Sequence, residues 1–174
     1  MAKLRKMLGS ADAPGVVALM RQMETQSRET LARWSAGYAR ESLLPICLAA
    51  HPQDTLPARL LALAMDWAEG RCDGKTVRPL LAALRDAVRQ ETAPAVQAAL
   101  RAIGTAAAVM QTPTNALGMT FYAAAALAYQ TLGEGADAAA YDACAEELFA
   151  GMLASLQSVS VPKEEHPARL DWHC

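Results

Sequence analysis

The stretch TPTNALGMTFYAAAALAYQTLG, residues 112–133, contains the most apolar part of the chain and decides its fold class. Thr112 followed by Pro113 is typical of a helix start, and Gly133 is typical of a helix end. Between them, apolar residues recur at helical spacing: Leu117, Phe121, Ala124, Ala128 and Leu132. Because a helix that is apolar on nearly all sides has to be buried, we expect this one at the centre of an all-helical fold, with Ala124 in the core.

Similar helix starts punctuate the rest of the chain. We expect helix-capping residues at six positions: Asp12, Thr55, Thr76, Thr92, Thr112 and Asp137. A proline follows four of them within two residues, and Pro79 lies in the first turn of the helix that Thr76 begins. Ser27 is either a further cap or a bend, and Pro45 kinks or ends the preceding helix near Leu44. The pattern predicts an all-α, single-domain irregular bundle of about seven helices over residues 1–174, with essentially no strand.

Residues 158–174 are expected to form an extended C-terminal tail packed on the bundle. The tail lacks helical periodicity, and Pro162 and Pro167 prevent it from extending the last helix. A free Trp172 would expose a large apolar ring, so we expect it to dock. Its indole N–H would then seek an oxygen acceptor from residues 111–115 or from the turn at residues 24–27.

Composition and charge exclude several classes of function. The 174 residues are 53% hydrophobic with a formal net charge of −2, and the basic residues are spread along the chain, so nucleic acid is not an expected partner. Polar residues such as Thr120, Tyr122 and Tyr129 interrupt the most apolar stretch, so no membrane span is expected. With four cysteines and no export segment, the chain is expected to be cytoplasmic.

No pattern of catalytic, cofactor-binding or metal-ligating residues emerges. The sequence has no Gly-x-Ser-x-Gly elbow, and its glycines lie singly at helix ends rather than in a phosphate loop. The adjacent Glu146 and Glu147 diverge by roughly 100° on a helix, which does not suit a shared acid–base site. Cys47 and His51 have a suitable helical spacing for one ion, but two ligands do not make a structural site, and a buried thiol beside an exposed imidazole is the simpler interpretation.

Two polar clusters interrupt the apolar helices, and they carry the candidate residues for a ligand or partner. One runs from Met23 to Thr30 and includes Glu24 and Gln26, and the other runs from Gln111 to Asn115. Each is explained either by helix capping with solvation or by a small polar patch that orients a bound molecule. With the two tail residues included, the candidate residues are Glu24, Gln26, Gln111, Thr112, Thr114, Asn115, Trp172 and His173.

Several short motifs together resemble a family of bacterial all-helical immunity proteins, the immunity-protein-five-like family. The motifs are Leu8–Ser10 with Asp12, Leu19 and Met20, Glu24–Ser27, Thr30–Ala32 with Trp34, Leu44–Ile46 with Pro52, Trp67, Ala102–Gly104, Thr112–Gly118 and Trp172–Cys174. Members of the family often carry His where Gln111 and Asn115 stand here. Because a neutral amide cannot titrate, a metal or proton-transfer role is not expected at this cluster.

The resemblance implies a non-enzymatic protein that binds a cognate toxin protein and blocks its active site or keeps it from its target. Exposed acids crowd the C-terminal third and form either a rim for a basic toxin surface or an ordinary solvated face: Glu134, Asp137, Asp142, Glu146, Glu147, Glu164 and Glu165. The alternative is a helical enzyme or small-molecule-binding protein with its pocket near residues 111–115. The identity of the toxin and the oligomeric state stay open.

Overall fold

Helices make up all of the regular structure in the computed structural model, which describes residues 3–173 and contains no strand among them. The prediction of an all-α fold is therefore confirmed. The helices are α1 (Pro14–Met23), α2 (Arg28–Ser42), α3 (Leu44–Ala50), α4 (Leu56–Ala68), α5 (Val77–Gln90), α6 (Pro94–Ala108), α7 (Asn115–Leu132) and α8 (Ala138–Val159).

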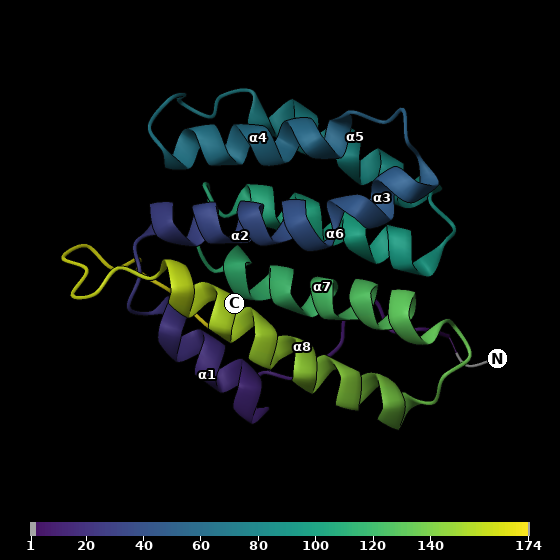
Figure 1. The fold of residues 1–174 in the computed structure, drawn as a ribbon. Coiled ribbons are helices and arrows are strands. Elements are labelled where there is room, and N and C mark those ends of the chain that lie inside the picture. Colours follow the sequence, from purple (N-terminus) through teal and green to yellow (C-terminus); the bar gives the residue numbers. More distant parts are fainter. Residues whose placement is uncertain (1–2, 174) are drawn as a thin grey trace.

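The helices are stacked in layers around α6 and α7. Figure 1 shows α4 and α5 at the top of the view, α2 and α6 below them, then α7, and finally α8 with α1. The most extensive packing is between α6 and α7, and α6 also contacts α2, α3, α4 and α5. The tail, the start of α2 and the α6–α7 connection all lie at the left-hand end of the bundle in Figure 1.

Alanines form much of the contact between the two central helices. In α6, Ala99, Ala102, Ala106 and Ala107 are fully buried, and in α7 the whole run 123–126 is fully buried, Ala124 included. Small side chains let helix axes approach closely, which explains how so few large residues enclose a core. The expected central position of the 112–133 stretch and the burial of Ala124 are both confirmed.

The additional element relative to the expected helices is α3. The chain breaks at Leu43, as the sequence predicts near Leu44, because Pro45 has no N–H to continue the hydrogen-bond ladder of α2. After the break, the chain forms a short separate helix, α3, which packs against α6. Ile46 and Cys47 are the buried residues of this helix.

Asp137 forms its expected side-chain cap, and Ser27, for which the sequence allows a cap or a bend, is a cap. The Ser27 hydroxyl accepts the N–H of Thr30 at 3.1 Å, and the Asp137 carboxylate accepts the N–H of Ala140 at 2.8 Å. Thr55 and Thr76 occupy the N-cap positions of α4 and α5 but make no capping hydrogen bond.

Three of the expected caps are wrong. The N-caps of α1, α6 and α7 are Ala13, Ala93 and Thr114 rather than Asp12, Thr92 and Thr112. In α1 and α6 the proline is itself the first helical residue, so the residue directly before it takes the N-cap position. The α6 N-terminus has no side-chain capping bond, and the Glu91 carboxylate instead stabilises the turn before it, where Oε1 accepts the N–H groups of Thr92 and Ala93, both at 2.8 Å.

The buried face of α8 differs slightly from the expected one. Helical spacing in the sequence predicts one core face made of Tyr141, Cys144, Leu148, Met152 and Leu156. Of these residues, Tyr141, Met152 and Leu156 are buried, whereas Cys144 and Leu148 are only partly buried. Ala145 and Phe149 take the central positions instead. Phe149 is fully buried and meets Phe121 of α7 edge-on, with ring centroids 6.2 Å apart. This aromatic pair joins α8 to the central helix.

Candidate functional site

The candidate residues suggested by the sequence fall into two groups that share no hydrogen bond among the described residues. Glu24, Gln26, Trp172 and His173 belong to the contact between the tail and the α1–α2 turn, whereas residues 111–115 form the connection between α6 and α7. Each group therefore has to be judged by itself.

Gln26 holds the tail against the bundle. Its side chain is 2% exposed, its Oε1 accepts the N–H of Val161 at 2.7 Å, and its Nε2 donates to the carbonyl of Val161 at 3.2 Å. The backbone carbonyl of Gln26 also accepts the N–H of Ala168 at 2.8 Å. All of these hydrogen-bonding groups have partners within the chain, so Gln26 joins the tail to the α1–α2 turn.

Trp172 contacts the same turn through Glu24. The indole N–H donates to Glu24 Oε1 at 2.6 Å, and the ring is partly buried against the bundle. Of the two acceptors expected for this indole, the structure therefore selects the turn at residues 24–27. His173 is exposed, and its backbone N–H donates to Asp171 Oδ1 at 2.9 Å.

Residues 111–115 form a tight turn stabilised mainly by the backbone. The N–H groups of Gln111 and Thr112 both donate to the carbonyl of Ala108 at 3.0 Å, and the N–H of Asn115 donates to the carbonyl of Thr112 at 3.1 Å. The side-chain amide of Asn115 also donates to the carbonyl of Ala108, at 3.3 Å. Thr114 is the N-cap of α7 without a side-chain bond.

The turn borders two different hollows in the surface. Gln111 lines a hollow of about 360 Å³ together with Trp67, Asp73 and Arg78, among others. Asn115 lines a groove of about 400 Å³ on another side of the turn. The polar cluster is thus divided between two surfaces and does not form one pocket.

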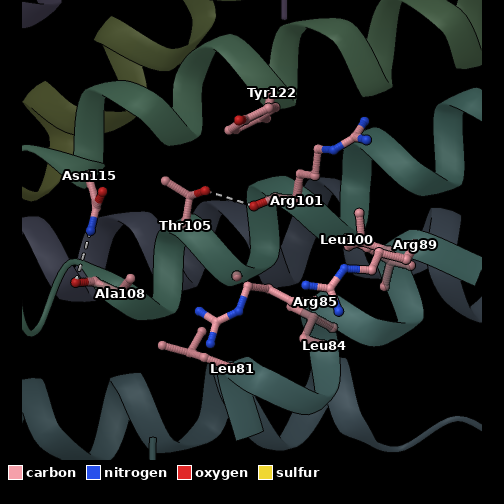
Figure 2. A pocket seen from close by; sticks show the side chains of 12 residues that line it. Leu81, Leu84, Arg85, Arg89, Leu100, Arg101, Thr105, Ala108, Asn115 and Tyr122 are labelled. Atoms are coloured by element: carbon pink, nitrogen blue, oxygen red, sulfur yellow. Dashed lines mark hydrogen bonds between the residues drawn. The ribbon is translucent and has the colours of Figure 1, made fainter. Parts of the chain in front are cut away.

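The groove runs between α5, α6 and α7, and Figure 2 shows the side chains that line it. Leu81, Leu84 and Val88 come from α5, and Leu100 comes from α6, so the floor is largely aliphatic. Gly104 keeps the floor open and the two helices close, because a Cβ at this position would approach Leu84 Cδ2 to 3.0 Å. The α7 side is formed by Tyr122 and Asn115.

Three arginines line the same groove: Arg85 and Arg89 from α5, and Arg101 from α6. Arg89 makes an ion pair with Asp86, with Nη1 and Oδ1 2.6 Å apart. The guanidinium groups of Arg85 and Arg101 make neither an ion pair nor a hydrogen bond with any described residue. Among residues 3–173, no carboxylate lines the groove, so its charge is positive although the chain carries a net charge of −2.

The sequence reasoning missed these arginines. A signal for them exists, because Arg85 and Arg89 are four residues apart and therefore share a face of α5 beside its apolar stripe. Charged residues on such a face are usually only solvated, and the approach of Arg101 from α6 becomes apparent only once the helices are packed.

The acidic residues of the C-terminal third serve several purposes. Asp137 caps α8, and Asp142 makes an ion pair with Arg5 at 2.6 Å. Glu134, Glu146 and Glu147 are exposed. The carboxylates of these three residues are therefore accessible to a binding partner.

Cys47 and His51 do not share a site. Burial raises the pKa of the Cys47 thiol to about 12, reinforced by the nearby charges of Asp54 and Glu91, so the thiol stays protonated. His51 is exposed and makes an ion-pair contact with Glu91, with Nε2 and Oε2 2.6 Å apart. Within residues 3–173, no group of three or more His, Cys, Asp or Glu side chains is arranged to hold a metal ion.

A family model described as "Imm-5 like putative immunity protein" matches residues 21–153. The chain belongs to this family. The match to the immunity-protein family includes the whole groove, the α6–α7 connection, Glu24 and Gln26. The N-terminal motif residues Leu8–Ser10, Asp12, Leu19 and Met20 lie outside it, as do the C-terminal motif residues Trp172–Cys174. Cys174 lies outside the described residues as well.

No curated protein and no solved structure matches the chain. Over residues 3–173, none of the helices combines the length and apolarity that a membrane crossing requires.

Proposed function

We propose that the protein binds a cognate toxin protein in the cytoplasm and neutralises it by occlusion, without catalysing a reaction. The observation that carries this proposal is membership of the immunity-protein family over residues 21–153. The closely packed helices support the proposal, because they hold the surface in one conformation. A surface that is already ordered loses little conformational entropy when a partner binds.

Two surfaces have the character that tight protein partners use. The groove offers an aliphatic floor surrounded by arginines, and arginine is enriched at the centres of protein interfaces. The exposed acids Glu134, Glu146 and Glu147 provide charges of the opposite sign, which would suit the rim of a contact with a basic toxin surface.

The proposal is tested by co-expression of the protein with a candidate toxin, sought among the genes that neighbour its own. We expect the protein to restore growth in cells that produce the active toxin, and the two chains to co-purify as a complex. The control is the same toxin with its catalytic residue substituted, which should bind without affecting growth. Growth arrest that persists despite abundant, folded protein would exclude this function.

Binding of a small molecule is a second candidate function, favoured by the groove of about 400 Å³ beside Asn115. A volume of this size falls within the range of small-ligand pockets. Native mass spectrometry of the protein purified without denaturation tests this candidate. A retained small molecule and no protein partner would support it, whereas a ligand-free spectrum together with a toxin complex would exclude it.

A further inference from the structure

We infer that the groove between α5, α6 and α7 is the docking site for an acidic segment of the toxin that carries aliphatic anchor residues. This inference rests on the proposed function and specifies the contact surface and the chemistry of the partner. Nothing in the family match assigns this surface or the arginines that line it.

The charge of the groove is the first argument. Arg85 and Arg101 have no carboxylate partner among residues 3–173, and Arg89 shares its charge with Asp86 alone. Guanidinium groups recognise carboxylates in a planar, two-point geometry, and a partner carboxylate would provide the missing acceptors. A basic segment would be repelled from the same surface.

The aliphatic floor is the second argument, because it requires more of the partner than negative charge. Leu81, Leu84 and Leu100 are buried at the base of the groove, and Val88, which lines it farther along α5, is only partly covered. Such a floor accepts a Leu, Ile or Val side chain and gains free energy when water is displaced. A polyanion without apolar groups would not displace water from this floor and would not gain that free energy.

The spacing of the arginines is the third argument. Figure 2 shows the guanidinium groups of Arg85, Arg89 and Arg101 at separate positions along the groove, rather than gathered at one point. A single compact anion contacts one such group at a time, whereas a segment with several carboxylates contacts them together. The arrangement therefore favours an elongated acidic peptide segment over phosphate or a small carboxylate.

A direct test uses a short fluorescein-labelled peptide in which pairs of Glu flank single Leu residues, with fluorescence anisotropy as the measurement. We expect binding that weakens as salt is added and that falls about tenfold or more in the double variant Arg85→Gln and Arg101→Gln. The matched control is Arg59→Gln, an exposed arginine of α4 outside the groove, which should bind as tightly as the wild type. A peptide with Gln in place of Glu should bind weakly.

Several outcomes would overturn the inference. Equal affinity of the wild type and the double variant would do so, as would equal binding of the Glu and Gln peptides. Inorganic phosphate or duplex DNA that binds more tightly than the Glu peptide, with the same dependence on Arg85 and Arg101, would instead assign the groove to a phosphate ligand. Circular dichroism and thermal melting of each variant confirm that it is folded.

The co-expression assay separates this inference from the proposed function. If the wild type protects cells and the folded double variant does not, the groove is the docking site. If both protect equally, the toxin binds elsewhere, and the inference fails while the function stands. If the wild type itself gives no protection, the immunity function fails, and the peptide measurements alone decide what the groove binds.

Discussion

The side chain of Gln26 and the backbone of Val161 form two reciprocal hydrogen bonds, 2.7 and 3.2 Å long, between residues 135 positions apart. The side-chain amide thus pairs with the tail as a neighbouring strand would. Together with the bond from Ala168 to the Gln26 carbonyl, this contact fixes the path of the tail over the α1–α2 turn.

Gln26→Ala should lower the free energy of unfolding by about 1–3 kcal/mol, because the buried amide's two hydrogen bonds to the backbone of Val161 are lost. Urea denaturation measures the change. Gln130→Ala is the control, since Gln130 is exposed on α7, and its effect should stay within about 0.5 kcal/mol. An equal effect of the two substitutions would show that the contact with the tail does not contribute to stability.

Trp172→Phe should release the end of the tail while leaving the rest of the bundle unchanged. The substitution keeps an aromatic ring but removes the N–H that donates to Glu24. We expect trypsin to cleave after Arg169 several times faster in the variant, as followed by mass spectrometry. Glu147→Gln, a change of an exposed carboxylate on α8, should leave the cleavage rate unchanged. The same rate in wild type and Trp172→Phe would contradict docking through this bond.

Gly74→Ala should destabilise the protein more than Gly70→Ala. Both glycines have a φ of 73°, so both substitutions carry the same backbone strain of about 1–2 kcal/mol. At Gly74, however, a Cβ would lie 3.0 Å from Met110 Sδ and 3.1 Å from Trp67 Cδ1, whereas at Gly70 the space is open. The difference in melting temperature between the two variants measures the destabilisation caused by the tight contacts at Gly74. Equal melting temperatures would show that these contacts cost no stability.

Ala124→Leu should lower the free energy of unfolding by about 1–3 kcal/mol through overpacking, because Ala124 is fully buried in α7. Ala150→Leu makes the same change at an exposed position of α8 and should have little effect. Chemical denaturation compares the two. A Leu at position 124 that is tolerated as well as one at position 150 would show that the core adapts at this position.

Glu91 should make stability depend on pH. Burial raises the pKa of Glu91, but hydrogen bonds from Ala93, His51 and Thr92 outweigh burial, and the net pKa lies below the ordinary value. A carboxylate with a lowered pKa in the folded state stabilises the protein above its unfolded pKa of about 4.3 and loses this contribution as the pH falls through the folded pKa.

Glu91→Gln should therefore be less stable than the wild type at pH 7, and the difference should shrink as the pH falls from about 5 to about 3. Urea denaturation across this range measures the difference. Glu147→Gln again serves as the control and should show little difference from the wild type at any pH. A difference between Glu91→Gln and the wild type that is constant with pH would contradict a role of the Glu91 charge.

The helices and their order were predictable because the signals are local. Ser27 and Asp137 cap helices through residues three positions away, and the apolar residues of 112–133 recur at helical spacing. The wrong caps have a local cause too: with Pro14 and Pro94 as first helical residues, the N-cap is the residue immediately before each. The positions of Pro14 and Pro94 in the sequence therefore already indicate Ala13 and Ala93 as the N-caps of α1 and α6.

The candidate site was less predictable, because it depends on contacts between distant residues. The polar character of Gln26 was evident, but its pairing with Val161 follows from how α1, α2 and α8 pack. Similarly, Arg85 and Arg101 are ordinary surface residues in the sequence and line one groove only because α5 packs against α6. Asn115 is the one predicted residue that lines the groove.

The α5 side of the groove is less deeply packed into the core than the α7 side. This helix packs mainly on α4 and α6, and only Val77, Leu81 and Leu84 of it are buried, whereas ten residues of α7 are. Local opening costs least where the least apolar surface is released, so backbone amides of α5 should exchange with solvent deuterium before those of α6 and α7. We therefore expect small displacements on partner binding to occur in the helix that carries Arg85 and Arg89 before they occur in the alanine-rich centre.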